Sequence, residues 1–257
     1  MTRIFTIIAL LTILTVSASA QTDTIRVACV GNSITYGHGI ADRSHDTYPA
    51  VLGRLLGDKY KVENFGISGR TLMNKGDVPY MKEQIYKDAL AFQPNIVTIK
   101  LGTNDSKPQN WKYQDTFKDD LRTLVRSFQE LPTHPRIYLC LPIPSTIPNW
   151  AINDSVITHG VIPYIREVAR EMHLSVIDIN TEFAPYVHLL QDGVHPNEDG
   201  ATLIAQWISQ RIIRDARARH NARTNNKVQR NKKQTSKSQY DRKKRMNHSP
   251  GDMKVRR

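Results

Sequence analysis

Short apolar runs alternate with longer amphipathic segments along most of this chain. The apolar runs end near Val30, Asn64, Leu101, Leu141 and Ile179, and their length and composition predict five strands. Apolar positions at helical spacing predict helices over residues 47–57, 80–92, 116–130, 156–173 and 198–214. This alternation is typical of an α/β fold, in which a parallel sheet carries helices on both faces.

Polar stretches follow three of these predicted strands. Ser33 comes directly after the first apolar run, Gly69 follows the second, and Asn104 follows the third. In open parallel sheets, ligands bind outside the carboxyl ends of the strands, so we expect these residues to meet at one edge. A fourth stretch, near the end of the folded part, contains Asp192 and His195.

These residues are the types that acyl transfer requires. At a spacing of three residues, Asp192 can hydrogen-bond one nitrogen of His195, and the other nitrogen is then free to take a proton from Ser33. The N–H groups of Ser33 and Gly69 and the amide of Asn104 are candidate donors to a tetrahedral oxyanion. A chemistry of this kind needs no metal and no cofactor.

In this order, the four stretches resemble the four conserved blocks of the SGNH (GDSL-type) hydrolases, over residues 25–214. The resemblance implies a three-layer α/β/α flavodoxin-like fold with a five-stranded parallel sheet. It also implies Ser33 as nucleophile, Gly69 and Asn104 as oxyanion-hole donors, His195 as base and Asp192 as its partner. Asn32 departs from the pattern, because the family name has Asp there. Asparagine keeps an acceptor oxygen but loses the charge, which affects subfamily assignment and local electrostatics rather than hydrolysis.

Exported relatives with a G-N-S first block resemble carbohydrate O-acetylesterases of the sialate or acetylxylan type. The resemblance therefore implies hydrolysis of short-chain esters, above all acetyl groups on glycans. A lysophospholipase or thioesterase of the same family is one alternative, and a non-catalytic protein that binds glycans or surfaces is another. Trp150 lies in a proline-rich loop after the fourth predicted strand, where it either lines a sugar pocket or packs the loop; we favour packing.

The first twenty residues differ from the rest of the chain. Arg3 precedes an apolar stretch over residues 4–16, and Ala18, Ser19 and Ala20 provide a small-residue cleavage site. This pattern predicts a secretory signal peptide over 1–20, and hence a periplasmic or secreted protein. A retained N-terminal anchor is the alternative. Residues 21–215 are then long enough for one domain with a substantial core.

The basic charge of the 257 residues lies in the C-terminal tail. Residues 216–257 hold 15 Lys and Arg against two Asp, a charge of +13, which leaves −1 for the rest of a chain whose total is +12. Low apolar content predicts disorder there. For an exported protein, anionic surface polysaccharide or lipid is the expected partner of such a tail rather than nucleic acid. A solvated, dispensable extension is the alternative.

The remaining candidate groups predict no metal site and no disulfide. Cys29 and Cys140 lie in the first and fourth predicted strands, which the third strand separates in a 2-1-3-4-5 order, so we expect two buried thiols. The spacing of His38, His45 and Asp46 is not a ligand spacing for metals, and a polar loop near the site is expected there.

Overall fold

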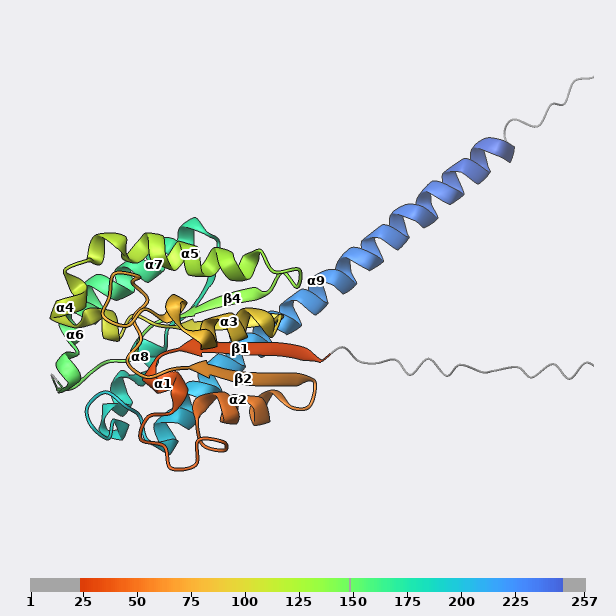
Figure 1. Cartoon of the computed structure of the whole chain (residues 1–257). Helices are drawn as coiled ribbons and strands as arrows, with labels where there is room; N and C mark the ends of the chain where they lie inside the picture. Colours follow the sequence, from red (N-terminus) through yellow and green to blue (C-terminus); the bar gives the residue numbers. More distant parts are fainter. Residues whose placement is uncertain (1–23, 148, 247–257) are drawn as a thin grey trace, which may run out of the picture.

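Five parallel strands form one sheet in the described part of the chain. The structure, a computed structural model, describes residues 24–147 and 149–246 (Figure 1). The strand order is β2-β1-β3-β4-β5, which confirms the predicted α/β fold and its flavodoxin-like topology. The strands are β1 (Ile25–Gly31), β2 (Tyr60–Gly66), β3 (Ile96–Lys100), β4 (Arg136–Cys140) and β5 (Ser175–Ile177).

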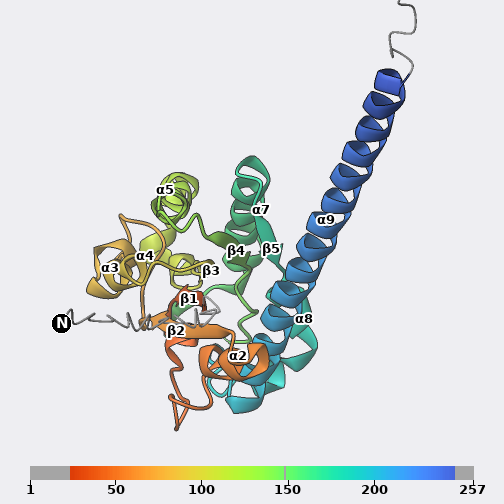
Figure 2. The same cartoon turned by 90° about the vertical axis from the view of Figure 1, so that its right-hand side faces the viewer.

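Helices cover both faces of this sheet, in three layers (Figures 1 and 2). One face carries α1 (Ser33–Tyr36), α2 (Tyr48–Leu56), α8 (Ile179–Phe183) and the first part of α9 (Glu198–Met246). The other face carries α3 (Gln84–Ala91), α5 (Phe117–Gln129) and α7 (Ile162–Glu171). Two short helices, α4 (Pro108–Trp111) and α6 (Asp154–Val156), lie in the loops that follow β3 and β4.

The sheet is buried from both sides, because every connection between neighbouring strands crosses over a face. All five residues of β3 are buried, as expected for a central strand of a parallel sheet. Val97 and Ile99 point into the core under α5 and α7, and Ile96 points into the core under α2 and α9. Thr98 and Lys100 are polar exceptions in this strand and are fully buried.

Three loops start at the same edge of the sheet. Gly31 at the end of β1 is in register with Gly66 at the end of β2 and with Lys100 at the end of β3. A Cβ atom at Gly31 would collide with the side chain of Thr35 and lie 2.9 Å from the carbonyl oxygen of Lys100. Glycine therefore allows the first turn of α1 to pack directly against the strand ends.

The predicted helices are present, but the end of the last one was predicted wrongly. We expected this helix to end at residue 214 and disorder to follow over 216–257, whereas α9 continues to Met246 and extends past the body of the domain (Figure 1). The part of that expectation over 247–257 lies outside the described residues. Residues 201–246 contain no glycine or proline, and Lys, Arg, Gln and Ala favour helix. The prediction of disorder considered the low apolar content of this segment and not the helix propensity of its residues.

Two other expectations concern the ends and the thiols. The predicted signal peptide over 1–20 lies outside the described residues, and no helix within them is long and apolar enough to cross a membrane. Cys29 and Cys140 are both free and buried, as predicted, and β3 separates their strands.

Candidate active site

Ser33, His195 and Asp192 form a continuous hydrogen-bonded chain. His195 Nε2 lies 2.9 Å from Ser33 Oγ, and His195 Nδ1 lies 2.7 Å from Asp192 Oδ2. Ser33 is the first residue of α1, and the other two lie in the loop before α9. Residues 162 positions apart in the sequence thus meet at the carboxyl edge of the sheet, as the sequence predicts.

Local hydrogen bonds hold each member of this chain in place. Asn32 caps α1, because its side-chain oxygen accepts the N–H of Ile34 at 3.1 Å. The asparagine at this position therefore makes the hydrogen bond that the aspartate of the family pattern could make. Asp192 Oδ1 accepts the N–H groups of Val194 at 3.0 Å and His195 at 2.8 Å. The Asp192 carboxylate thereby fixes the turn that carries the imidazole.

The three predicted oxyanion donors face one hollow. Gly69 has φ +80°, and a Cβ there would meet nothing within 4 Å, so its N–H is open to approach. One N–H of the Asn104 amide donates to the carbonyl of Arg70 at 3.1 Å, which leaves the other available. The N–H of Ser33 lies in the first turn of α1, where a helix provides no acceptor.

The hollow has a volume of about 210 Å³. This active-site pocket is smaller than the usual range for drug-sized ligands. All five predicted site residues except Asp192 line it. Its described lining consists of Ser33, His38, Ser68, Gly69, Thr103, Asn104, Lys107, Trp150, Ile152, Val194 and His195.

Asp105 joins two of the loops that supply donors, a role that we missed in the sequence. This fully buried carboxylate accepts the N–H of Leu72 at 2.9 Å and the N–H of Met73 at 2.8 Å. It thereby fastens the loop after Gly69 to the turn that contains Asn104. Burial raises the pKa of Asp105 to about 6, although the backbone hydrogen bonds act in the opposite direction.

Two aromatic rings surround the imidazole. Trp150 Nε1 donates to Asp192 Oδ2 at 3.0 Å, and the Trp150 residue is 56% exposed with φ +59°. The ring of His38 lies 4.4 Å from that of His195, centroid to centroid. We preferred a packing role for Trp150; the structure places it in the pocket lining and on the carboxylate. The sequence signal was a lone tryptophan in the loop after β4.

A family model for GDSL-like lipase and acylhydrolase proteins matches residues 29–203. That is more than half of the 257 residues, and the match contains every predicted site residue. The chain belongs to this family. The resemblance expected from the four polar stretches is therefore confirmed at the level of the family.

A relative in Xylanibacter ruminicola named acetylxylan esterase is 47% identical over 208 residues. The match covers 74% of this chain and 43% of that protein, so the chain spans less than half of its relative's length. The relative is therefore a longer protein, and the similarity extends over only part of it.

Solved structures share the fold at low identity. A carbohydrate acetylesterase from Sinorhizobium meliloti has a TM-score of 0.60 at 16% identity, covering 74% of this chain and 98% of its own. A lipase/acylhydrolase from Enterococcus faecalis has a TM-score of 0.61 at 22% identity, covering 73% and 95%. An aryl esterase from M. smegmatis has a TM-score of 0.59 at 18% identity, covering 73% and 98%. Identities of this size support the fold alone.

The surroundings of the imidazole set its charge. Burial lowers the pKa of His195 below its ordinary value of 6.5, and Asp192 opposes the shift without cancelling it. For Asp192, burial acts to raise the pKa, but hydrogen bonds from His195, Trp150 and the backbone outweigh it and hold the pKa well below its usual range. At neutral pH, the pair is therefore a neutral base beside a carboxylate.

Lys100 adds a buried cation close to this edge of the sheet. The residue is fully buried, and its Nζ has no hydrogen-bond partner among the described residues. Burial lowers the pKa of Lys100 to about 8. Its charge also acts to lower the pKa of His195. The side-chain N–H₂ of Asn32 is likewise buried and unpartnered, so the site has donors without acceptors in the described part of the chain.

The grouping of His38, Asp192 and His195 brings their potential ligand atoms within 4.8 Å of one another. Both nitrogens of His195 already face partners, Ser33 Oγ on one side and Asp192 Oδ2 on the other. The arrangement therefore fits a proton relay better than a metal site. His45 and Asp46, which the sequence placed near the site, contact each other at 2.6 Å and do not line the pocket.

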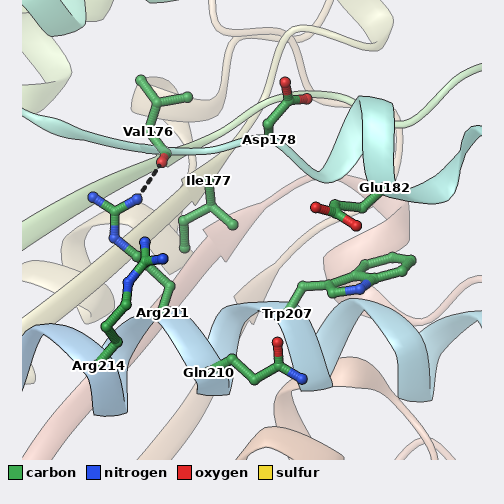
Figure 3. A pocket seen from close by; sticks show the side chains of 8 residues that line it. All are labelled: Val176, Ile177, Asp178, Glu182, Trp207, Gln210, Arg211 and Arg214. Carbon is green, nitrogen blue, oxygen red and sulfur yellow. Dashed lines mark hydrogen bonds between the residues drawn. The ribbon is translucent and has the colours of Figure 1, made fainter.

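A different hollow of about 400 Å³ lies beside β5, between α8 and α9 (Figure 3). Figure 3 shows Glu182 facing Trp207 across the hollow, while Arg211 donates to the carbonyl of Val176 at 3.1 Å. Its described lining contains no serine, cysteine or histidine. It therefore lacks the serine or cysteine nucleophile and the histidine base of the proposed acyl transfer, and none of the predicted site residues lines it.

Proposed function

We propose that this protein is a serine esterase that hydrolyses acetyl esters on carbohydrates. The observation that carries the proposal is the hydrogen-bonded chain from Ser33 Oγ through His195 to Asp192. Ser33 is the nucleophile, His195 the general base and Asp192 the group that orients the imidazole and balances its charge. Gly69 and Asn104, together with the N–H of Ser33, are the oxyanion donors.

The reaction proceeds in two steps. His195 Nε2 takes the proton of Ser33 as Oγ attacks the ester carbonyl, and the oxyanion forms against the three donors. The imidazolium, stabilised by Asp192, returns that proton to the departing alcohol. Water then attacks the acyl-serine with His195 again as base, and carboxylic acid leaves. The first proton transfer joins Ser33 Oγ and His195 Nε2, which lie 2.9 Å apart in the resting protein.

Two observations support a short acyl group on a sugar. The active-site pocket of about 210 Å³ fits an acetyl group better than a long chain. The exposed ring of Trp150 at its mouth offers the amphipathic surface on which sugars pack. The name of the Xylanibacter ruminicola relative, acetylxylan esterase, agrees with this substrate class.

The test is acetate release by the full mature chain and its Ser33→Ala variant. The substrates are p-nitrophenyl acetate, acetylated xylo-oligosaccharides, O-acetylated sialic acid and a lysophospholipid. We expect serine-dependent release from an acetylated glycan and little from the lipid. Release from the lipid alone would favour the lysophospholipase alternative. Glycan binding without serine-dependent release from any ester would favour a binding protein.

We propose further that the protein is exported, with residues 1–20 removed as a signal peptide. Sequencing of the N-terminus of protein recovered from the periplasm or medium tests this, and Gln21 is the expected first residue. A mature chain that begins at Met1 in the cytoplasm would contradict it.

For the basic part of α9, we propose an anionic polysaccharide as partner. Six exposed cations follow one another at spacings of three or four residues, which keeps them on one face of the helix. This cationic stripe is about 27 Å long at 1.5 Å per residue. It comprises Arg219, Arg223, Lys227, Arg230, Lys233 and Lys237. A linear polymer with regularly spaced carboxylates complements it in charge and shape.

Two double variants of equal charge change test the stripe. Lys227→Gln with Arg230→Gln removes two cations of the stripe, and Arg217→Gln with Lys232→Gln removes two from the opposite face. We expect the first pair to weaken binding to polygalacturonate about tenfold more than the second, with a steeper loss in salt. Equal losses would contradict a specific face, and binding only to anionic vesicles would assign the stripe to lipid.

A further inference from the structure

A second hollow lies next to the active-site pocket. This hollow has a volume of about 440 Å³ and is lined by the segments 145–147 and 151–155 together with Pro108. Ile152 lines both cavities, and Lys107, which lines the active-site pocket, directly precedes Pro108. The two cavities are therefore neighbours, with Ile152 and the peptide between residues 107 and 108 at their common border.

The two cavities differ in size and lining, which indicates that they hold different parts of the substrate. The active-site pocket takes the acyl group, because the nucleophile and the oxyanion donors line it. The second hollow lies within the volume range of small-molecule sites and is large enough for sugar units. Its surroundings offer hydroxyl and carboxylate groups, from Ser145, Asp154 and Ser155. An alcohol that carries a short acyl group would thus extend from one cavity into the other.

Lys107 places a positive charge at the junction. It is the only charged residue in the described lining of the active-site pocket apart from the histidines, and no carboxylate belongs to that lining. Within the described residues, Lys107 belongs to none of the ion pairs. A half-buried ammonium group without a counter-charge favours a ligand that brings one.

The backbone of Lys107 is fixed relative to the reacting group. Its N–H donates to the carbonyl of Asn104 at 3.3 Å, and its own carbonyl accepts the N–H groups of Asn110 at 2.9 Å and Trp111 at 2.8 Å. Lys107 therefore starts from the same turn that carries an oxyanion donor. Lys107 lines the active-site pocket, and the next residue, Pro108, lines the second hollow.

We propose that Lys107 binds the carboxylate of an acidic sugar next to the acetyl ester, with the glycan chain in the second hollow. This inference rests on the proposed esterase function and adds the substrate's charge to it. The carboxylate has two possible sources, a uronic acid within a polysaccharide or a sialic acid. The large second hollow and the cationic stripe favour the polysaccharide, because a single sialic acid would reach neither fully.

The test compares kcat/KM on three acetylated substrates: a xylo-oligosaccharide with a uronic acid branch, the same oligosaccharide without it, and O-acetylated sialic acid. The variants are Lys107→Gln and Lys107→Arg, with Lys87→Gln, an exposed lysine on α3, as the matched control. We expect the native enzyme to prefer the acidic oligosaccharide. Lys107→Gln should reduce that preference about tenfold through KM, Lys107→Arg should largely retain it, and Lys87→Gln should not change it.

Each outcome separates this inference from the proposed function. Serine-dependent activity with equal kcat/KM on the acidic and neutral oligosaccharides would overturn the role of Lys107 and leave the esterase intact. Absence of serine-dependent activity on every ester would overturn the esterase itself. A Lys107-dependent preference for sialic acid alone would keep the carboxylate contact and overturn the polysaccharide assignment.

A substitution in the second hollow tests where the chain lies. Ser155 is exposed and lines the hollow, and among the described residues its hydroxyl hydrogen-bonds to His159, so we expect Ser155→Trp to fill the hollow at little cost in folding. We expect it to lower kcat/KM for acetylated oligosaccharides about tenfold relative to p-nitrophenyl acetate. An unchanged ratio would show that the glycan lies elsewhere.

Discussion

Trp150 and His195 donate to the same oxygen of Asp192, at 3.0 Å and 2.7 Å. The indole thereby gives the carboxylate a second side-chain donor besides the imidazole. Because Asp192 Oδ1 is occupied by two backbone N–H groups, the carboxylate has little freedom to rotate. A residue in a loop after β4 thus helps to orient the base contributed by the loop before α9.

Replacing Trp150 with Phe should therefore slow catalysis without unfolding the protein. The ring is retained and the N–H is lost, so we expect kcat to fall about tenfold, equivalent to about 1.4 kcal/mol. Trp111→Phe, in a separate aromatic stack with Phe117 and Tyr164, is the control. Steady-state kinetics and thermal unfolding measure the two effects. A kcat unchanged by Trp150→Phe would assign the indole to packing.

The pH dependence of kcat/KM should report His195. Burial lowers its pKa below 6.5, and the base acts only when neutral. Activity should therefore be constant at neutral pH and fall through one ionisation with its midpoint below 6.5. Asp192→Asn should lower kcat by roughly 10³–10⁴-fold and move the midpoint further down, because the carboxylate favours the imidazolium. A native midpoint above 7 would contradict this assignment.

Lys100→Met should stabilise the protein at neutral pH. The pKa of Lys100 is lowered from 10.5 to about 8, so the native state disfavours the charged amine. Between pH 8 and 10.5, the unfolded chain binds more protons, and the stability of the native enzyme rises with pH. Denaturant unfolding should give a gain of about 3 kcal/mol for Lys100→Met below pH 8, declining towards zero near pH 10.5.

The same variant has a second readout in catalysis. Loss of the charge at Lys100 should raise the pH midpoint that His195 sets, because the cation acts to lower that pKa. A stability gain without any shift in the midpoint would show that Lys100 does not influence the base. A loss of stability would show that the buried amine has an acceptor in solution.

Asp105→Asn should loosen the contact between two loops of the site. One amide oxygen cannot replace two carboxylate oxygens that accept the N–H groups of Leu72 and Met73. We expect a loss of about 1–3 kcal/mol in the free energy of unfolding and a lower kcat. The exposed Asp119→Asn is the control. Reduced stability with an unchanged kcat would limit Asp105 to a structural role.

Because the pKa of Asp105 is raised, we also expect the free energy of unfolding to depend on pH. Its pKa is raised from 3.8 to about 6, so the native state binds more protons than the unfolded chain between these values. Its contribution to stability is complete below pH 3.8 and declines as the pH rises through 6. The difference between native protein and Asp105→Asn should change over this interval only.

The sequence predicted the parts of the site that follow from periodicity and topology. Ser33, Gly69 and Asn104 each follow a strand, and parallel strands end at a common edge, so their meeting could be expected. Asp192 and His195 are close in sequence, which made their hydrogen bond predictable. The order of the five strands followed from the resemblance to the family, which implied a flavodoxin-like fold, and the structure has that order.

Contacts between loops could not be predicted in this way. Asp105 and Trp150 act on partners more than thirty residues away, and no spacing rule connects a loop side chain with a distant backbone N–H or carboxylate. Lys100 was assigned no role from the sequence, and its full burial at the end of β3, in register with Gly31 of β1, depends on the packing of the whole sheet edge. The length of α9 depended on propensity, which apolar patterning does not register.

The continuity of α9 fixes the separation between the esterase site and the cationic stripe. Glu198 begins the helix three residues after His195, and the stripe begins at Arg219, about 30 Å further along a rigid rod. A short oligosaccharide cannot span that interval, whereas the polysaccharide that we propose as the partner of the stripe would keep its ester groups at high effective concentration near Ser33. The fixed separation along the helix would thus favour long polysaccharides over short oligosaccharides as substrates.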